Sequence, residues 1–537
     1  MLVSLEDLDL MLKKLSNNTL AHVLTVFLVA VLTFLPTLQM FFYLDEWGNL
    51  YEFTHVPYQF TIFTAHMFYL LFSIFGISAT DYFAVGIFIY ALSATLLYFF
   101  VSTLTKNKLL GLIAGLIYAT SPIGIDTVIM LWTYFLEGGY PLTIALLLLL
   151  YLILRYFQGG KIFFFILALL GFFVFLELEP RRVFLFLPII ILFDYLMHFR
   201  KIIVPDFKFF LRQTPFFICF VLYYKYSVTL SGIFATGRIA LADSGSYDWQ
   251  TKLDLLLNTF SDPKPFVTLA NILLGAFLVL PKEILNLTTV KGTFFWTALI
   301  IVIAAALVVI GFKIKKEFGF MLLFSLGWIY INILGIYVFS SPGISETTHR
   351  TLSLSAPAYA MFIAISGYVL FLYLKEKIKK KEKFGKFFLE NQQTLFFSVL
   401  ILFLGFNLYA THSHFEKFNA FRSRPARAFF KDLKTFHPSF PKKSLLYIET
   451  SKDPQIKHRL TRIYGGNNLG AGATIAVFYP ELTYKEIDLV RELKDVEKFL
   501  RDDPKKIDQV FYFYYDENGL KDQTKEFRLK LKSNQKF

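Results

Sequence analysis

The chain lacks the residues on which several classes of protein depend. Among its 537 residues there is one cysteine, Cys219, so no disulfide can form within the chain and its fold does not depend on the redox compartment. No cluster of histidine, cysteine and carboxylate has the spacing of metal ligands. The pattern gives no support to a divalent ion held by Asp45, Glu46 and Asp126, and we expect no cofactor.

Charged residues are also scarce, at 18% of the chain against 55% hydrophobic and 19% aromatic residues. With a mean hydropathy of +0.53, this composition is typical of a polytopic membrane protein. Much of the net charge of +14 lies in short segments between apolar runs, where cytoplasmic loops carry their basic residues. The basic excess therefore indicates membrane topology, and we expect no nucleic-acid partner.

The N-terminus lacks the small-residue cleavage pattern of a secretory signal. Residues 21–43 are too long an apolar stretch for a typical signal, and we predict that they form the first membrane span. In residues 1–20 apolar and charged positions alternate, which predicts a short cytoplasmic amphipathic helix or a plain tail.

Stretches of about 17 to 25 mostly apolar residues recur up to residue 411. They predict eleven membrane helices, at 21–43, 81–104, 107–125, 141–157, 161–177, 182–199, 209–229, 294–312, 319–340, 353–374 and 394–411. Eleven crossings place the basic residues near 106–108, 155–161, 200–212, 313–316 and 375–386 on the cytoplasmic side, together with the N-terminus. Residues 266–280 are apolar but short, and a crossing there would disrupt the charge pattern, so we predict an interfacial or re-entrant helix.

From about residue 412 the composition changes to a charged, soluble pattern. Strands are predicted at 445–450, 473–479 and 509–515, and helical spacing occurs at 457–464 and 484–501. The expected fold is an all-α polytopic bundle of about 11 spans at 21–411, followed by a small α/β or α+β domain at 412–537. The predicted topology places the protein in the cell membrane with this C-terminal domain outside.

An acidic pair, Asp45-Glu46, stands where the first span ends. Carboxylates at a membrane face are costly to place unless they are paired, hydrated or used. The alternative is that they mark the water edge of a helix. They open the predicted first outer loop, 44–80, which continues through His55-Val56-Pro57 to an amphipathic segment, 61–76, that we expect to lie in the membrane plane.

The acidic pair, the His-x-Pro element, the in-plane helix ending in Phe75-Gly76 and the serial spans occur in an order that resembles the GT-C glycosyltransferases. Within that superfamily the chain is most similar to the dolichyl-phosphate-mannose protein mannosyltransferase and aminoarabinose transferase type, over roughly residues 21–188. The resemblance implies a GT-C-like helical bundle. It also implies an inverting membrane glycosyltransferase that moves a sugar from a polyprenyl-phosphate carrier to a glycan, lipid or protein acceptor at the outer membrane face.

In such enzymes the acidic residue of the first loop is the general base. The resemblance therefore implies Asp45 as the base, with Glu46 assisting or binding the acceptor. A carboxylate can take the proton that an acceptor hydroxyl loses as it attacks the anomeric carbon. The lipid phosphate that leaves needs cationic or hydrogen-bonding partners.

Two further predicted outer loops supply candidate substrate-binding residues. Asp126 either lies beside Asp45 or caps a short helix between two spans. Glu179, Arg181 and Arg182 form a charged turn on the side that the positive-inside bias disfavours for arginine. The arginines contact a phosphate, or they pair with acidic residues of the same turn.

A fourth outer segment, 345–351, precedes a late span. It is similar to the Arg-Tyr-Leu-Pro region of related enzymes but has Thr351 in place of the tyrosine. Arg350 is a candidate partner of the carrier phosphate, and His349 is a second one. For both residues the alternative is a solvated helix start.

Other functional classes remain open. A lipid-linked glycan transporter or flippase would line a path with its charged residues, but that class usually places them at mid-membrane and shows repeated halves. Here the charges gather at one face, and we see no internal repeat. A polysaccharide polymerase or ligase would share the need for arginine without requiring the acidic pair, and a receptor-like structural protein is a third alternative.

Overall fold

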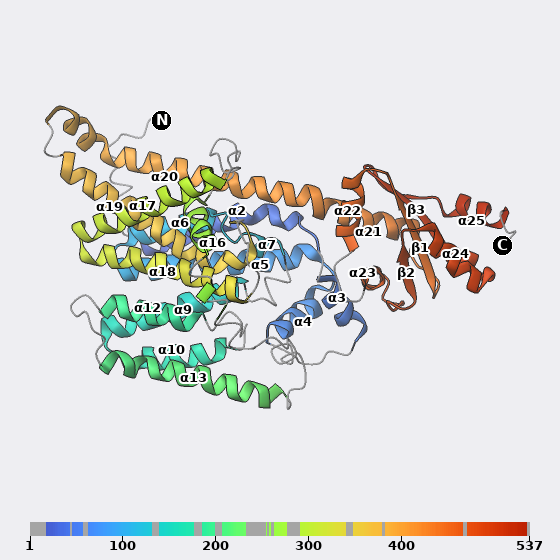
Figure 1. Cartoon of the computed structure of the whole chain (residues 1–537), viewed down its shortest axis with the longest axis horizontal. Helices are drawn as coiled ribbons and strands as arrows, with labels where there is room; N and C mark the ends of the chain where they lie inside the picture. Colours follow the sequence, from blue (N-terminus) through green and yellow to red (C-terminus); the bar gives the residue numbers. More distant parts are fainter. Residues whose placement is uncertain are drawn as a thin grey trace.

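Two parts of the chain are visible in the computed structural model: a bundle of long helices and, at one end of it, a small domain with a sheet (Figure 1). The bundle helices run roughly along the long axis of the molecule. The structure describes residues 18–42, 46–56, 63–130, 139–176, 185–198, 207–231, 254, 257–258, 262–275, 290–339, 347–378, 382–464 and 470–533.

Helices overlap all eleven ranges predicted as spans, although three of these helices have only 13 or 14 residues. Among the described residues, seven helical segments are long and apolar enough to cross a membrane, which indicates a membrane-embedded protein. The helices of the bundle are α2 (Thr19–Phe34), α5 (Ala79–Thr105), α6 (Lys108–Thr120), α9 (Gly139–Gly159), α10 (Ile162–Phe175), α12 (Phe186–His198), α13 (Phe207–Ser231), α17 (Val290–Ile314), α18 (Lys316–Phe339), α19 (Ala356–Ile378) and α20 (Glu382–Phe418).

Helices α5 and α6 form a tight antiparallel hairpin. Lys106 ends α5 in the left-handed conformation (φ 55°), and the side chain of Asn107 accepts hydrogen bonds from the first free N–H groups of α6. Gly111 lets the two helices approach closely, because a Cβ atom there would lie 2.7 Å from the carbonyl oxygen of Tyr98. The hairpin returns the chain to the end of the bundle where α5 begins.

A short helix, α16 (Lys264–Leu274), occupies the position predicted for an interfacial or re-entrant helix. Its 11 residues extend only about 16 Å at 1.5 Å per residue, roughly half of a hydrocarbon core. It packs on α18, where Thr268 and Tyr337 share a hydrogen bond of 3.0 Å between their hydroxyl groups. The predicted segment continues to residue 280, beyond the described residues, so its placement as an interfacial or re-entrant helix stays a prediction.

The C-terminal domain contains a four-stranded sheet in the order β2-β1-β3-β4. The strand β1 pairs in parallel with both β2 and β3, and β3 pairs antiparallel with β4. Helices connect the parallel strands, as in α/β folds. The elements are α21 (Arg424–Phe436), β1 (Ser444–Thr450), α22 (Pro454–Tyr464), α23 (Ala471–Phe478), β2 (Ile487–Val490), α24 (Leu493–Asp502), β3 (Val510–Asp516), β4 (Gly519–Asp522) and α25 (Thr524–Ser533).

The strands predicted at 445–450 and 509–515 are confirmed by β1 and β3, but the strand predicted at 473–479 is wrong. That segment is the helix α23, which is buried over most of its length, so no polar face interrupts its apolar run. A short buried helix cannot be told from a buried strand by periodicity. The helical prediction at 484–501 is wrong in its first half, which contains β2, and right in its second half, which is α24.

The last bundle helix joins the two parts of the molecule (Figure 1). Helix α20 continues past the predicted boundary at residue 412 and passes through the π-helical turn η4 (Asn419–Ser423) into α21. A π-helical turn is rare and frequently occurs at functional sites. The continuous helical path carries residues 412–418 along the end of the bundle.

Candidate functional site

The second and fourth predicted outer loops meet at the end of the bundle. The N–H of Gly124 donates to the carbonyl oxygen of Thr347, and the N–H of Asp126 donates to that of Thr348, both at 2.9 Å. The hydroxyl of Thr127 donates to the carbonyl oxygen of Arg350 at 3.0 Å. We call residues 121–130 and 347–355 the loop pair, because these bonds hold two segments far apart in the sequence side by side.

Close contact within the loop pair requires a glycine at position 124. Gly124 has a φ of +68°, a conformation that L side chains rarely adopt. A Cβ atom there would lie 2.4 Å from both the Cα and the backbone nitrogen of Ser353. Both the backbone conformation and the absence of a side chain therefore permit the approach.

Asp126 is the first residue of the four-residue helix α7 (Asp126–Ile129), but its side chain does not cap it. Its Oδ1 accepts a hydrogen bond from Nε2 of His414, at 2.7 Å. The side chains are 14% and 27% exposed, respectively. Of the two predictions for Asp126, helix capping is thus wrong, and proximity to Asp45 concerns a residue outside the described part of the chain.

His414 is the polar residue at this site that reasoning from the sequence missed. Its place is fixed by the helix that carries it: the hydroxyl of Thr411 donates to the carbonyl oxygen of Thr120 at 2.9 Å, and Nε2 of His412 bonds to that of Thr33 at 2.9 Å. These contacts attach α20 to the ends of α6 and α2. The signal in the sequence was two histidines directly after the last predicted span.

The fourth loop positions its two candidates differently. Nδ1 of His349 lies 2.8 Å from the hydroxyl of Thr351 and accepts a bond from its N–H at 3.3 Å. It caps the 3₁₀ helix η3 (Arg350–Ser355), which supports the helix-start alternative for His349. The half-buried Arg350 lies against the second loop, with Nη1 3.9 Å from Sδ of Met130.

Glu46 is the first described residue of the first predicted outer loop, and it begins the helix α3 (Glu46–His55). Glu46 is 1% exposed, so it does not face open water here. The preceding candidate, Asp45, lies outside the described residues, as do Glu179, Arg181 and Arg182. The predicted in-plane helix is confirmed as a helix, α4 (Phe63–Phe75), and its orientation to a membrane stays a prediction.

Trp47 attaches the start of α3 to the rest of the protein. It is fully buried, and its ring lies 5.1 to 5.8 Å from the rings of Phe41, Phe42, Phe430 and Phe478. Phe430 belongs to α21 and Phe478 to α23, and these two rings stack at 4.4 Å. We call these five residues the aromatic cluster. It connects the chain before and after Asp45 to the C-terminal domain.

The far end of α3 is also bound to the C-terminal domain. The hydroxyl of Tyr51 accepts a hydrogen bond from the N–H of Tyr484 at 3.2 Å. Nε2 of His55 donates to the carbonyl oxygen of Leu482 at 2.8 Å, and its ring stacks on Tyr51 at 4.2 Å. The histidine of the His-x-Pro element thus has a structural role between the loop and the domain.

The last helices contact both groups of residues. His414 of α20 bonds to the loop pair, while Asn419 of η4 donates to the side chain of Gln39 at 3.3 Å. Arg427 of α21 donates to the carbonyl oxygen of Met40 at 3.0 Å and lies over the ring of Phe41. The segment leading to the acidic pair and the loop pair are therefore positioned by one continuous stretch of helix.

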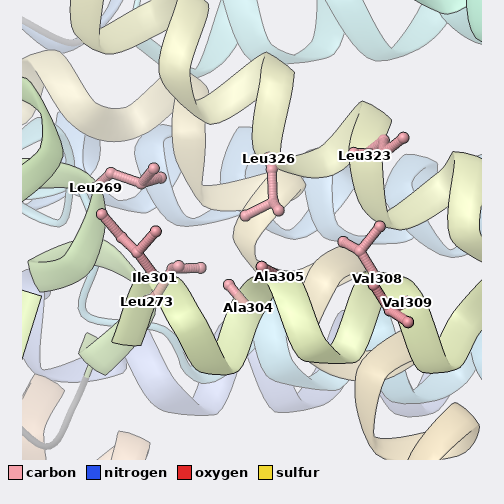
Figure 2. Close-up of a pocket in the computed structure, with 9 residues that line it drawn as sticks. All are labelled: Leu269, Leu273, Ile301, Ala304, Ala305, Val308, Val309, Leu323 and Leu326. Carbon is pink, nitrogen blue, oxygen red and sulfur yellow. The ribbon is translucent and has the colours of Figure 1, made fainter. Parts of the chain in front are cut away.

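A separate pocket of about 320 Å³ lies between α16, α17 and α18 (Figure 2). In the view, Leu326 extends from one helix toward Ala305 on the next. The pocket is lined entirely by aliphatic side chains, so it offers no group for acid, base or metal chemistry. Its lining residues are Leu269, Leu273, Ile301, Ala304, Ala305, Val308, Val309, Leu323 and Leu326.

Comparison with protein-family models finds no match for the chain, and comparison with curated proteins finds none either. Within the described residues, no group of three or more histidine, cysteine, aspartate or glutamate side chains could hold a metal ion. The candidate residues that the structure describes are the hydrogen-bonded pair Asp126 and His414, Arg350 of the adjoining loop, and the buried Glu46 at the start of α3.

Replacing Gly124 by alanine is expected to separate the loop pair, because the new Cβ would overlap the backbone of Ser353 and the residue would keep a positive φ. Amide hydrogen exchange of the full chain in lipid nanodiscs should become faster in residues 347–355. Gly160→Ala is the matched control, since Gly160 has a φ of +64° but nothing within 4 Å of an added Cβ. Equal exchange in the two variants would contradict the close-contact account.

Replacing Trp47 by alanine is expected to loosen α3 from the C-terminal domain. Truncation of a buried tryptophan typically costs about 3–5 kcal/mol. Exchange of the α3 amides should rise, while exchange in α17 stays unchanged and Trp47→Phe gives an intermediate effect. Unchanged protection of α3 in the alanine variant would show that the aromatic cluster does not hold the loop.

Proposed function

We propose that the chain is a GT-C-like membrane glycosyltransferase that moves a sugar, with inversion, from a polyprenyl-phosphate carrier to an acceptor at the outer membrane face. The observation that carries the proposal is that the first and second predicted outer loops both contact one helical stretch, α20–η4–α21, and that the fourth loop is hydrogen-bonded to the second. These loops contain the acidic pair, Asp126 and Arg350, which the sequence predicts for the site.

The proposed topology has eleven spans. A helix overlaps each predicted range, seven helical segments among the described residues are long and apolar enough to cross, and the proposal counts residues 266–280 as an interfacial or re-entrant segment. With this number of crossings the basic loops share the cytoplasmic side, and the loop pair, α3 and the C-terminal domain share the other. Their mutual contacts support this assignment, because segments on opposite faces of a membrane could not bond to one another.

In the proposed reaction Asp45 is the general base, and the buried Glu46 holds the start of α3 or binds the acceptor. As the acceptor oxygen attacks the anomeric carbon, its proton passes to the carboxylate, and the bond from that carbon to the phosphate oxygen breaks. The carrier phosphate then carries an additional negative charge. Arg350 of the fourth loop is the proposed partner of this phosphate.

The aliphatic pocket between α16, α17 and α18 suits the hydrocarbon part of such a donor (Figure 2). It shares α18 with the fourth loop, since Asn332 of that helix donates to Ser355 at 2.7 Å and to the carbonyl oxygen of Thr351 at 3.3 Å. A lipid tail in the pocket and a phosphate at Arg350 would therefore be held by adjoining parts of one helix.

A flippase or transporter would move the lipid without breaking the bond to the sugar. The described charges favour transfer, because Asp126 and Arg350 lie in two loops that are hydrogen-bonded to each other at the end of the bundle, and not along a path through its middle. A polymerase or ligase would use a related donor, and it would have no requirement for the acidic pair on α3.

Asp45→Asn is expected to lower kcat for sugar transfer at least about 100-fold, because the variant cannot accept the proton. Arg350→Ala should instead raise KM for the lipid donor about tenfold or more, because it removes a charge-assisted hydrogen bond. Both are measured on the full chain in nanodiscs with polyprenyl-phosphate-linked sugars. Glu481→Gln, at an exposed carboxylate of the C-terminal domain, should retain full activity.

Full activity of Asp45→Asn would remove Asp45 as the base, and Glu46→Gln would then be tested in its place. Unchanged donor KM in Arg350→Ala would reject the phosphate contact. Movement of intact lipid-linked sugar across the membrane without transfer would establish the flippase alternative.

A further inference from the structure

His414 has one ring nitrogen occupied and the other accessible. Nε2 is bound by the carboxylate of Asp126, at 2.7 Å, while none of the described residues bonds to Nδ1. The side chain is 27% exposed. A carboxylate on one ring nitrogen fixes the orientation of an imidazole and directs the other nitrogen toward a ligand.

The backbone of the helix also holds this histidine in place. Thr411, almost one turn earlier, bonds to α6, and His412 bonds to α2. The ring of Phe415, the next residue, packs at 5.5 Å from Phe34. The position of His414 is therefore determined by three neighbouring contacts as well as by Asp126.

The same short helix, α7, lies between His414 and Arg350. Asp126 at its start binds the imidazole, Thr127 bonds to the backbone of Arg350, and Met130 just beyond its end contacts the guanidinium group. Two side chains that can carry positive charge thus flank one turn of helix. Only the imidazolium form of histidine donates from both ring nitrogens, so the proposed anion contact is made by that form, with Nε2 donating to Asp126 and Nδ1 to the anion.

We propose that His414 binds the phosphate of the lipid carrier together with Arg350, and that Asp126 is a positioning residue for His414. This inference rests on the proposed function and changes the role of Asp126, which the sequence predicts as a substrate ligand. Because the carboxylate already accepts from Nε2, its part is to orient the ring. The ligand is a phosphate ester on a hydrocarbon chain, and His414 contacts it in the ground state and as charge develops on leaving.

The test measures binding of farnesyl phosphate and of farnesol to the full chain in nanodiscs of neutral lipid. The ratio of the two affinities isolates the phosphate, because the hydrocarbon parts are identical. His414→Gln is expected to lower this ratio about tenfold, as for a charge-assisted hydrogen bond, and to leave farnesol binding unchanged. Unchanged farnesol binding also shows that the variant is folded.

His412→Gln is the matched control, because this neighbouring histidine bonds to the backbone of α2 and should not change the ratio. Asp126→Asn should lower the ratio less than His414→Gln does, since the amide oxygen can still accept from Nε2 without the charge. Inorganic phosphate at an equal concentration should not displace farnesyl phosphate, and displacement would contradict a lipid phosphate as the ligand.

The outcomes separate this inference from the proposed function. If the wild type binds farnesyl phosphate more tightly than farnesol and His414→Gln keeps the same ratio of affinities, His414 does not bind the phosphate. The proposal of a phosphate-containing donor would then still stand. A wild-type ratio of one overturns both. A ratio that falls in His414→Gln and is unchanged in Asp126→Ala, which removes the acceptor of the Nε2 bond, overturns the positioning role of Asp126.

Discussion

The position of the loop helix α3 against the C-terminal domain depends on the burial of Trp47. Its ring packs among phenylalanines from the end of the first span, from α21 and from α23, three parts of the chain that are far apart in the sequence. Removing about 200 Å² of such a ring from water contributes on the order of 5 kcal/mol. That is enough to hold the loop helix α3, which begins at Glu46, against the C-terminal domain.

The loop pair obeys a different constraint, because backbone groups near a membrane cannot be left without hydrogen-bond partners. The N–H groups of Gly124 and Asp126 are satisfied by carbonyl groups of the fourth loop, as strands would be in a sheet. Aromatic burial thus positions the first loop, and backbone hydrogen bonds position the second and fourth. Helix α20 and its continuation contact both, so the C-terminal domain is part of the proposed site's support.

Much of the bundle follows from the sequence because lipid permits few backbone structures, and a long apolar run in it has to be helical. The same reasoning fails at α23, where a soluble domain buries an apolar segment in either a helix or a strand. The carboxylates and arginines of the loops could be named from their charge and place. Their grouping could not, because it depends on contacts between residues such as Asp126 and His414, which are 288 positions apart.

The position of His414 could not be predicted from the local sequence pattern. It follows the last apolar run, where the sequence indicates a change of domain, and only the continuation of α20 as a helix turns it toward the second loop. Gly124 is a similar case, since nothing in the local sequence shows that the backbone of Ser353 will pack against it. The candidate site residues can be found in the sequence, but the contacts that bring them together depend on the fold.

The central claim is that these parts form one sugar-transfer site on the side of the C-terminal domain. The most direct measurement is transfer from radiolabelled polyprenyl-phosphate-linked sugars by the full chain in proteoliposomes, with the orientation determined from the accessibility of the C-terminal domain to protease. The account predicts labelled product only when the acceptor is on the same side as that domain. Product formed from the opposite side, or none from any donor, would contradict it.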